Sequence, residues 1–154
     1  MALKSLFSDQ DVRQRFARFL EVVEKRQIQR LQYLGELCVE KARLIPANIG
    51  FTDQTGNLRS SIGYAVFRDG KVVAENFEVV KSGKEGSEKG KSIAENISKK
   101  YPDGILLVVV AGMNYALKLE SKGRDVLTTA ELFAQTELPK MLKELADNIG
   151  KATQ

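Results

Sequence analysis

A run of apolar residues at helical spacing, from Val12 to Ile45, constrains the fold of this chain more than any other feature. The residues recur at steps of three and four, with Gln27 as the one polar break, which predicts an amphipathic helix. They are Val12, Phe16, Phe19, Leu20, Val23, Leu31, Leu34, Cys38, Ala42 and Ile45. Ser8 or Asp9 is placed to cap this helix, and Pro46 ends it because proline cannot donate a backbone hydrogen bond.

A helix over about 9–45 is long for a chain of 154 residues. At 1.5 Å per residue it extends on the order of 50 Å, which exceeds the diameter of a domain of this size. Part of it is therefore expected to project from the domain or to pack on another subunit. Ile28, Leu37 and Val39 lie off the main stripe and are candidates for a second apolar face. The alternative is a helix that bends or breaks near Gly35.

The rest of the chain mixes strand patterns with helix patterns. Ile62, Tyr64 and Val66 alternate as in a strand over 60–68, and Asp69-Gly70 is a two-residue hairpin signal that leads into a second strand over 71–80. Further along, the sequence predicts a mobile polar loop over 81–90 and a short helix over about 88–99 with Ile93 and Ile97 buried. It then predicts a central strand over 105–113 that is apolar on both faces, followed by a strand or helical turn over 114–122. A last helix is expected from Thr128 or Thr129 to about Ile149, kinked at Pro139 and ended by Gly150.

The last helix is expected to face inward with a set of large apolar side chains: Leu132, Phe133, Leu138, Met141, Leu142 and Leu145. The order helix, hairpin, helix, strand, short segment, helix does not alternate strictly. We therefore predict an α+β fold, in which a small antiparallel or mixed sheet is packed by a long N-terminal helix, a short middle helix and a C-terminal helix. No linker divides the chain, so 1–154 is expected to form a single domain.

The residue composition argues against most enzyme classes. The chain has no histidine, which removes the usual general base near neutral pH and the commonest transition-metal ligand. The single cysteine, Cys38, excludes an internal disulfide and a cysteine-cluster zinc site, and its place on the apolar stripe makes it a core residue. We expect no catalysis, no cofactor, no metal and no small-molecule substrate. Pairs such as Asp9/Asp11 and Glu36/Glu40 read as capping or solvated charges.

The hydropathy of the chain argues against a membrane protein. No apolar run reaches the length that a bilayer requires, and Met1–Phe7 holds one lysine but no sustained apolar region, so we reject a signal peptide. We expect the protein to stay in the cytoplasm of the cell that makes it.

The segment Gly86–Ser92 has a superficial likeness to a phosphate-binding loop. A true loop of that type has four residues between its glycines, whereas three separate Gly86 from Gly90, and the carboxylate of Glu85 would repel a phosphate. We interpret it as a basic loop before a helix that Ser87 caps. The basic residues in and beside it are a candidate contact with DNA or a partner: Lys81, Lys84, Lys89 and Lys91.

Two short segments about fifty residues apart carry a family resemblance. The first is Thr55-Gly56-Asn57-Leu58-Arg59-Ser60-Ser61-Ile62, and the second is Val110-Ala111-Gly112-Met113-Asn114-Tyr115-Ala116-Leu117-Lys118-Leu119-Glu120. The first has a local explanation as a helical turn that enters a strand, with Leu58 anchored in the core. Together the segments resemble the small head–tail joining proteins (neck, tail-completion, minor capsid or tail components) of tailed bacteriophages. The resemblance extends over about 44–132.

What the resemblance implies is a structural role without chemistry. Copies of the chain would form a homo-oligomeric ring at the head–tail junction or tail end of a phage or prophage virion, in contact with portal and tail proteins, after assembly in the cytoplasm of the bacterial host. The implied inter-subunit contacts are Thr55, Gly56, Asn57, Leu58, Arg59, Tyr115, Lys118 and Glu120. The chain departs from the family at 121–125, where a glycine-threonine step is often found, and in the long polar segment 81–100.

Two other classes of function remain open on the sequence. One is a DNA-associated or other small binding module without catalysis, which would use the lysines of 81–100 and bind DNA with a steep salt dependence. The net charge of +4 is mild, and acids are mixed with bases along the chain, which favours only weak DNA contact. The other class is an enzyme with a carboxylate or lysine site, for which no spacing in the sequence gives support.

Overall fold

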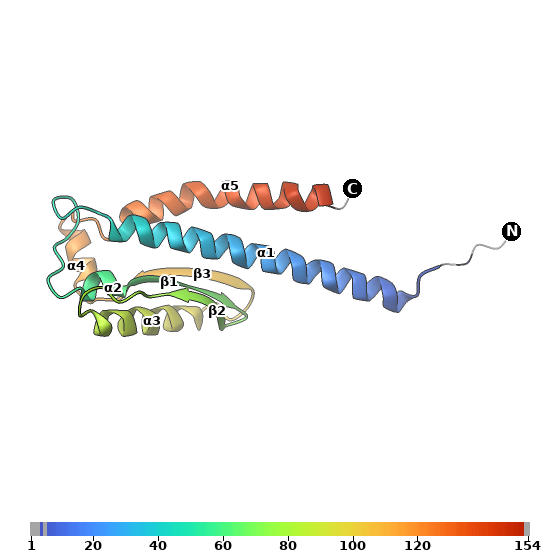
Figure 1. Ribbon diagram of the computed structural model, residues 1–154, viewed down its shortest axis with the longest axis horizontal. Coiled ribbons are helices and arrows are strands. Elements are labelled where there is room, and N and C mark those ends of the chain that lie inside the picture. The colour runs from blue at the N-terminus through green and yellow to red at the C-terminus, as the bar shows by residue number, and fades with distance from the viewer. Residues whose placement is uncertain (1–3, 5, 153–154) are drawn as a thin grey trace.

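Helix α1 runs without a break from Asp9 to Arg43 in the computed structural model, which describes residues 4 and 6–152 (Figure 1). Ser8 caps it as predicted: its hydroxyl accepts from the Asp11 backbone N–H at 3.1 Å, and the Asp11 carboxylate accepts from the Ser8 N–H at 3.1 Å. The helix ends before Leu44, so the predicted end at Ile45 is about two residues too late. No break occurs at Gly35, which is buried against the Tyr64 ring.

Some predictions fall on residues outside those that the structure describes. The rejection of a signal peptide rests on Met1–Phe7, of which Met1, Ala2, Leu3 and Ser5 lie outside the described residues. Thr153 and Gln154 lie outside them as well.

Three antiparallel strands form the sheet: β1 (Ile62–Arg68), β2 (Lys71–Asn76) and β3 (Ile105–Ala111). The hairpin turn at Asp69-Gly70 is confirmed, since both residues have the positive φ (49° and 75°) that such a turn requires. The strand order is β2-β1-β3, so β1 is central. The prediction that 105–113 forms the central strand is therefore wrong. Strand β3 is apolar on both sides because helices cover both faces of the sheet, although only one of its edges is paired within this chain.

Helices cover the sheet in layers. Helix α1 lies on one face and α3 (Lys84–Ser98) on the other, and α5 (Thr128–Ala152) packs on α1 (Figure 1). Two short helices, α2 (Asn57–Ser61) and α4 (Ala116–Ser121), lie together at one end of the sheet. The α+β fold with an antiparallel sheet is thus confirmed, and the open choice for 114–122 resolves to a helix.

Several predicted boundaries and orientations are wrong. The predicted mobile loop 81–90 is helical from Lys84, and Ser87 lies inside that helix instead of capping it. Helix α5 continues through Gly150 to Ala152 and contains Pro139. Leu132 and Leu142 are exposed, whereas Met141 and Leu145 are buried as expected. Helix α5 packs mainly on α1, so its inward face is narrower than the sequence pattern suggests.

The sheet separates two apolar clusters. On the α1 side, Ile62, Tyr64 and Val66 pack with Leu34 and Cys38. On the α3 side, Ala65 and Phe67 pack with Phe77, Ala94 and Val108. The predicted alternation in β1 is confirmed, and both halves of the alternation are buried. Cys38 is a core residue as predicted, and burial raises the pKa of its thiol.

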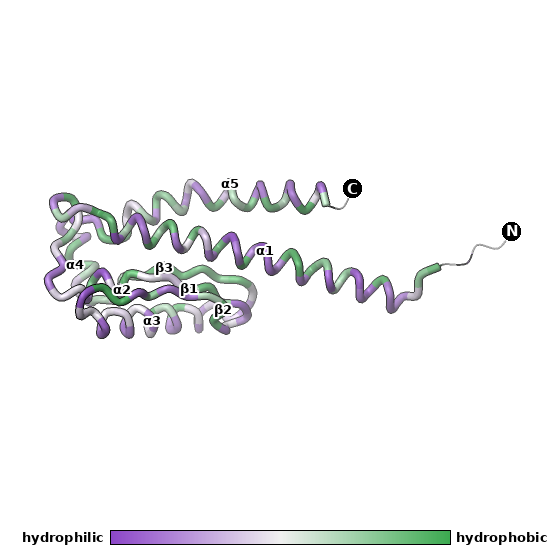
Figure 2. Tube along the Cα trace, in the orientation of Figure 1, coloured by the Kyte–Doolittle hydropathy of each residue, from purple (hydrophilic) through white to green (hydrophobic). Residues whose placement is uncertain are grey.

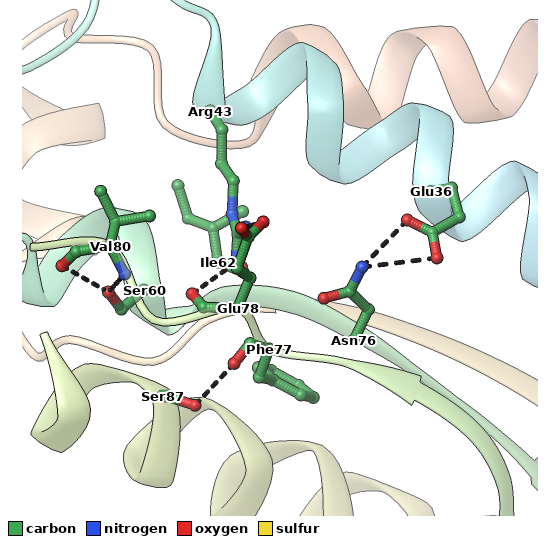
Figure 3. Close-up of polar contacts among 9 residues, drawn as sticks. All are labelled: Glu36, Arg43, Ser60, Ile62, Asn76, Phe77, Glu78, Val80 and Ser87. Atoms are coloured by element: carbon green, nitrogen blue, oxygen red, sulfur yellow. Dashed lines mark hydrogen bonds and ion pairs between the residues drawn. The ribbon is translucent and has the colours of Figure 1, made fainter.

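Polar contacts fasten the end of α1 and the segment after β2 to the sheet (Figure 3). The Arg43 guanidinium donates to the Ile62 carbonyl at 2.7 Å, to the Glu78 carbonyl at 3.1 Å and to the Glu78 carboxylate at 3.2 Å. The Ser60 hydroxyl accepts from the Val80 N–H at 2.7 Å, and the Ser87 hydroxyl donates to the Phe77 carbonyl at 2.8 Å. Residues 77–80 are therefore held beside the sheet by these hydrogen bonds, although they are not part of a strand.

The Tyr64 hydroxyl predicts a loss of stability at alkaline pH. It donates to the Glu36 carboxylate at 2.7 Å, and burial, with that charge beside it, raises its pKa above the usual 10.0. An unfolded tyrosine ionises near pH 10 while folded Tyr64 stays neutral, so the unfolded state binds fewer protons and the free energy of unfolding falls as pH rises further. The Tyr64→Phe variant should be somewhat less stable at pH 8, by about 1 kcal/mol, and lose less stability above pH 10.

Urea unfolding at a series of pH values measures this effect. Tyr33→Phe is the matched control, because Tyr33 lies on the same helix as Glu36 and is exposed. A Tyr64→Phe variant whose stability falls above pH 10 as steeply as that of the unmodified chain would show that Tyr64 does not contribute.

No other helix or strand of the described chain covers the first half of α1. The helix extends beyond the sheet and beyond the end of α5 (Figure 1), and its side chains from Asp9 to Val22 are exposed. Val12, Phe16, Phe19 and Leu20 are 38–60% exposed although they continue the apolar stripe of the buried half. Figure 2 shows this half of the helix with apolar and polar positions interleaved. The predicted projection of the helix is present in the structure.

Candidate functional site

The two segments of the family resemblance meet at the end of the sheet that carries α2 and α4. Strand β1 follows the first segment and β3 leads into the second, and the two strands pair from Ile62 opposite Ala111. Beyond the strands, the Gly112 N–H donates to the Ser61 carbonyl at 3.2 Å. The pKa of Tyr115 is raised by partial burial and by the charges of Asp53 and Glu85. Residues about fifty positions apart thus form one structural unit.

Asp53 organises the first segment. Its side chain accepts from the Gly56 N–H at 3.0 Å and from the Arg59 N–H at 2.8 Å, and the residue is buried. Gly56 stands before α2 with φ 81°, a left-handed conformation that favours glycine. Sequence analysis missed Asp53, although an aspartate three residues before a glycine is a recognisable turn signal.

Most of the residues in 55–59 that were predicted to contact another subunit form contacts within their own chain instead. Leu58 is fully buried, the Thr55 hydroxyl accepts from the Asn57 N–H at 3.3 Å, and the Asn57 side chain accepts from the Gly86 N–H at 3.2 Å. The Arg59 guanidinium donates to the Arg43 carbonyl and lies 5.2 Å from the centre of the Phe51 ring. Of these residues, Thr55 is exposed, while Gly56, Asn57, Leu58 and Arg59 mainly build the turn.

The predicted inter-subunit contact residues of the second segment also divide into one that is used within the chain and two that are exposed. The Glu120 carboxylate accepts from the backbone N–H groups of Val126, Leu127 and Thr128 at 3.3, 2.6 and 3.2 Å, which caps the start of α5. Tyr115 and Lys118 are exposed. Leu117, which was not predicted, is 79% exposed between them. Thr55, Tyr115, Leu117 and Lys118 are thus the exposed residues of this unit that are candidates for contact with a partner, and we call this set the α4 patch.

The glycines near the start of α3 are sites of close packing. A side chain on Gly86 would meet the Asn57 backbone, and one on Gly90 would lie 2.6 Å from the Ser61 carbonyl. Gly112 in turn approaches the Gly90 backbone so closely that a Cβ would lie 2.6 Å from its nitrogen. Helix α3 therefore touches α2 backbone to backbone, which explains the glycine spacing without a phosphate.

The four lysines of the predicted DNA or partner contact have partners within the chain. Lys89 pairs with Glu85 at 2.8 Å and Lys91 with Glu75 at 2.9 Å, while Lys84 lies 4.0 Å from Glu88. The Lys81 ammonium donates to the Asp53 carbonyl at 2.8 Å. Three of these positive charges thus lie beside carboxylates and the fourth lies on a backbone carbonyl, whereas nucleic-acid binding is favoured by basic residues clustered without acids.

No metal site or membrane span is found in the part of the chain that the structure describes. Over residues 4 and 6–152, no three histidine, cysteine or acidic side chains come together in a way that could hold a metal ion. Among the described helices, none combines the length and the hydropathy that crossing a membrane requires.

An apolar groove lies between α1, β3 and α5, and sequence analysis missed it. Two adjoining hollows, each of about 470 Å³, share Leu31, Ile105 and Leu138. The first is lined mainly by apolar residues from Leu34 to Leu138, with Glu131 at its rim, and the second continues along α1 to Glu24. The groove exists because α5 packs on α1 and does not extend over β3, so that α1 alone covers this face of β3 and covers it only in part. No pattern in the sequence indicates how α5 lies relative to β3.

Comparison of the chain with protein-family models, with curated proteins and with solved structures finds no match. The family resemblance therefore rests on the two segments and their surroundings.

Proposed function

We propose that this chain is a structural assembly protein of a tailed-phage or prophage virion, which forms an oligomeric ring at the head–tail junction or tail end. The observation that carries the proposal is the union of the two resembling segments in one unit, where they leave the α4 patch exposed. Tyrosine and leucine side chains at such a patch are suited to a protein partner, because they bury large apolar area on contact.

The partners in this proposal are other copies of the chain, portal proteins and tail proteins. The protein would assemble in the cytoplasm of the bacterial host and remain in the virion. The proposal includes no catalysis: the carboxylates of this unit, Asp53 and Glu120, accept from backbone N–H groups.

The test is binding to portal and tail proteins of the phage or prophage whose genome encodes this chain. Pull-down and light scattering should show a complex, with rings visible by negative-stain imaging. The double variant Tyr115→Ala/Leu117→Ala should weaken binding by about tenfold or more while its thermal unfolding is unchanged. Tyr101→Ala is the control, because Tyr101 is exposed but lies in the turn before β3.

Two results would contradict the proposal. One is no affinity for any portal or tail protein. The other is tight DNA binding that weakens steeply with salt, which would favour the binding-module alternative.

A further inference from the structure

The exposed half of α1 and the groove are complementary features of one molecule. We call Val12, Phe16, Phe19, Leu20 and Val23 the α1 ridge. At about 100° per residue these five residues fall within an arc of about 100° on the helix. The ridge runs about 17 Å along the axis, and the α1 residues that line the groove, Glu24 to Cys38, run about 21 Å. The ridge and the groove are thus two mainly apolar surfaces of similar length, so one could cover the other.

The ridge cannot occupy the groove of its own chain. Both belong to one continuous helix, and the ridge extends away from the body of the molecule (Figure 1). A second copy is the occupant that has a surface of the right length and character.

The orientation of the two features selects the symmetry. The α1 residues of the groove, among them Gln27, Leu34 and Cys38, lie on the same side of the helix as the ridge. We propose that two copies associate about a two-fold axis, with their α1 helices antiparallel and each ridge seated in the groove of the other copy. One axis perpendicular to α1 near residue 24 satisfies both contacts at once. The contact then closes on itself, as two-fold interfaces do.

Charge favours the same arrangement. Arg13 lies beside the ridge, about 20° beyond Leu20 around the helix, and it forms no ion pair within the described chain. The far end of the groove, near Cys38, carries Glu131 at its rim, where its carboxylate meets the Gln135 amide at 3.3 Å. In the antiparallel pair the start of one ridge reaches this end of the other groove. Arg13 therefore arrives beside Glu131 of the second copy.

This pairing is separate from the proposed virion role. The α4 patch lies at the opposite end of the molecule from the ridge (Figure 1), so a two-fold pair leaves that patch accessible. The pair would hide the apolar ridge and the apolar groove of the free chain before any assembly with other proteins.

The first test measures association of the full chain by sedimentation velocity over a concentration series. The unmodified chain should form a particle of two chains and nothing larger through this contact. The variant Phe16→Glu/Phe19→Glu should raise the dissociation constant on the order of 100-fold, since it places two charges in the apolar groove. Gln10→Glu/Gln14→Glu adds the same charge on the opposite face of the helix and should leave the dissociation constant unchanged. Circular dichroism verifies that both variants keep their helices.

A second test detects the two-fold axis directly. In this antiparallel pair the same residue of the two copies meets only near residue 24, whereas in a parallel pair every residue of the ridge would meet its equivalent. Val23→Cys should therefore form an intermolecular disulfide under mild oxidation, whereas Val12→Cys, at the far end of the ridge, and Val22→Cys, about 100° round the helix, should not. The native Cys38 is buried and does not compete.

Four outcomes would overturn the proposal. They are a strict monomer at millimolar concentration, association that the ridge variant does not weaken, equal cross-linking at positions 22 and 23, and binding of the ridge to anionic lipid vesicles in place of self-association. If the chain still bound portal or tail proteins in any of these cases, the proposed function would stand and only the two-fold pair would fail.

Discussion

Gly86→Ala is expected to lower the free energy of unfolding by about 2–3 kcal/mol, although alanine favours a helix more than glycine does. The added methyl group would meet the carbonyl group and Cα of Asn57, which are backbone atoms and cannot rotate away. Helix α3 would then have to move off α2, and the hydrogen bond from the Gly86 N–H to the Asn57 side chain would lengthen. Urea unfolding followed by circular dichroism measures the loss.

Gly150→Ala is the control for this substitution. Gly150 also lies in a helix, but a Cβ there would have no neighbour within 4 Å. The change should stabilise the chain by up to about 1 kcal/mol through helix propensity alone. If both variants were stabilised alike, the close contact of α3 with α2 would be wrong.

Leu58→Ala is expected to cost about 3 kcal/mol of stability, because a buried leucine loses its transfer free energy and leaves a cavity. Leu58 is 1% exposed and belongs to the core that α1 shares with the sheet. Leu117→Ala is the matched control, since Leu117 is 79% exposed and its truncation should change stability by less than about 0.5 kcal/mol. Thermal unfolding of the two variants gives the comparison.

The same pair separates folding from assembly in the resembling segments. Leu58→Ala should weaken partner binding only as far as it unfolds the chain, whereas Leu117→Ala should weaken binding with the fold intact. A stable Leu58→Ala variant would contradict the role of Leu58 as the anchor of α2.

The periodicity of apolar residues made the long helix α1 predictable from the sequence. The stripe from Val12 to Ile45 and the Ser8 cap gave α1 within about two residues at either end. The hairpin was predictable for a different reason, since Asp69-Gly70 fits a turn that few other dipeptides adopt. These signals are local, so they do not depend on how the elements pack.

The errors arise where two structures share one local pattern. An apolar run such as 105–111 is expected for a strand with two paired edges or for an edge strand covered on both faces, and β3 is the latter. Glycines at 83, 86 and 90 suit a mobile loop, but they also suit a helix whose backbone touches another, which is their role in α3. Only the tertiary structure separates these alternatives.

The candidate site was predictable in part. The sequence identified the two segments, and the structure brings them together through β1 and β3. The direction of each side chain was not predictable, because Glu120 and Lys118 look alike as polar residues after a strand. One of them caps α5 and the other is exposed. A side chain is available to a partner only if it is not already used in a contact within the chain, and the sequence does not show those contacts.

Arg43 gives α1 a mechanical role. The helix spans about 40 Å from Phe16 to Arg43, and at that end the guanidinium is anchored to β1 and to the segment after β2. A rod held along one half and free along the other transmits force. A small sideways load on the exposed half therefore becomes a torque on the packed half, which lies on the sheet and against α5. The two ends of this protein are joined by a stiff element, so whatever holds one of them also constrains the other.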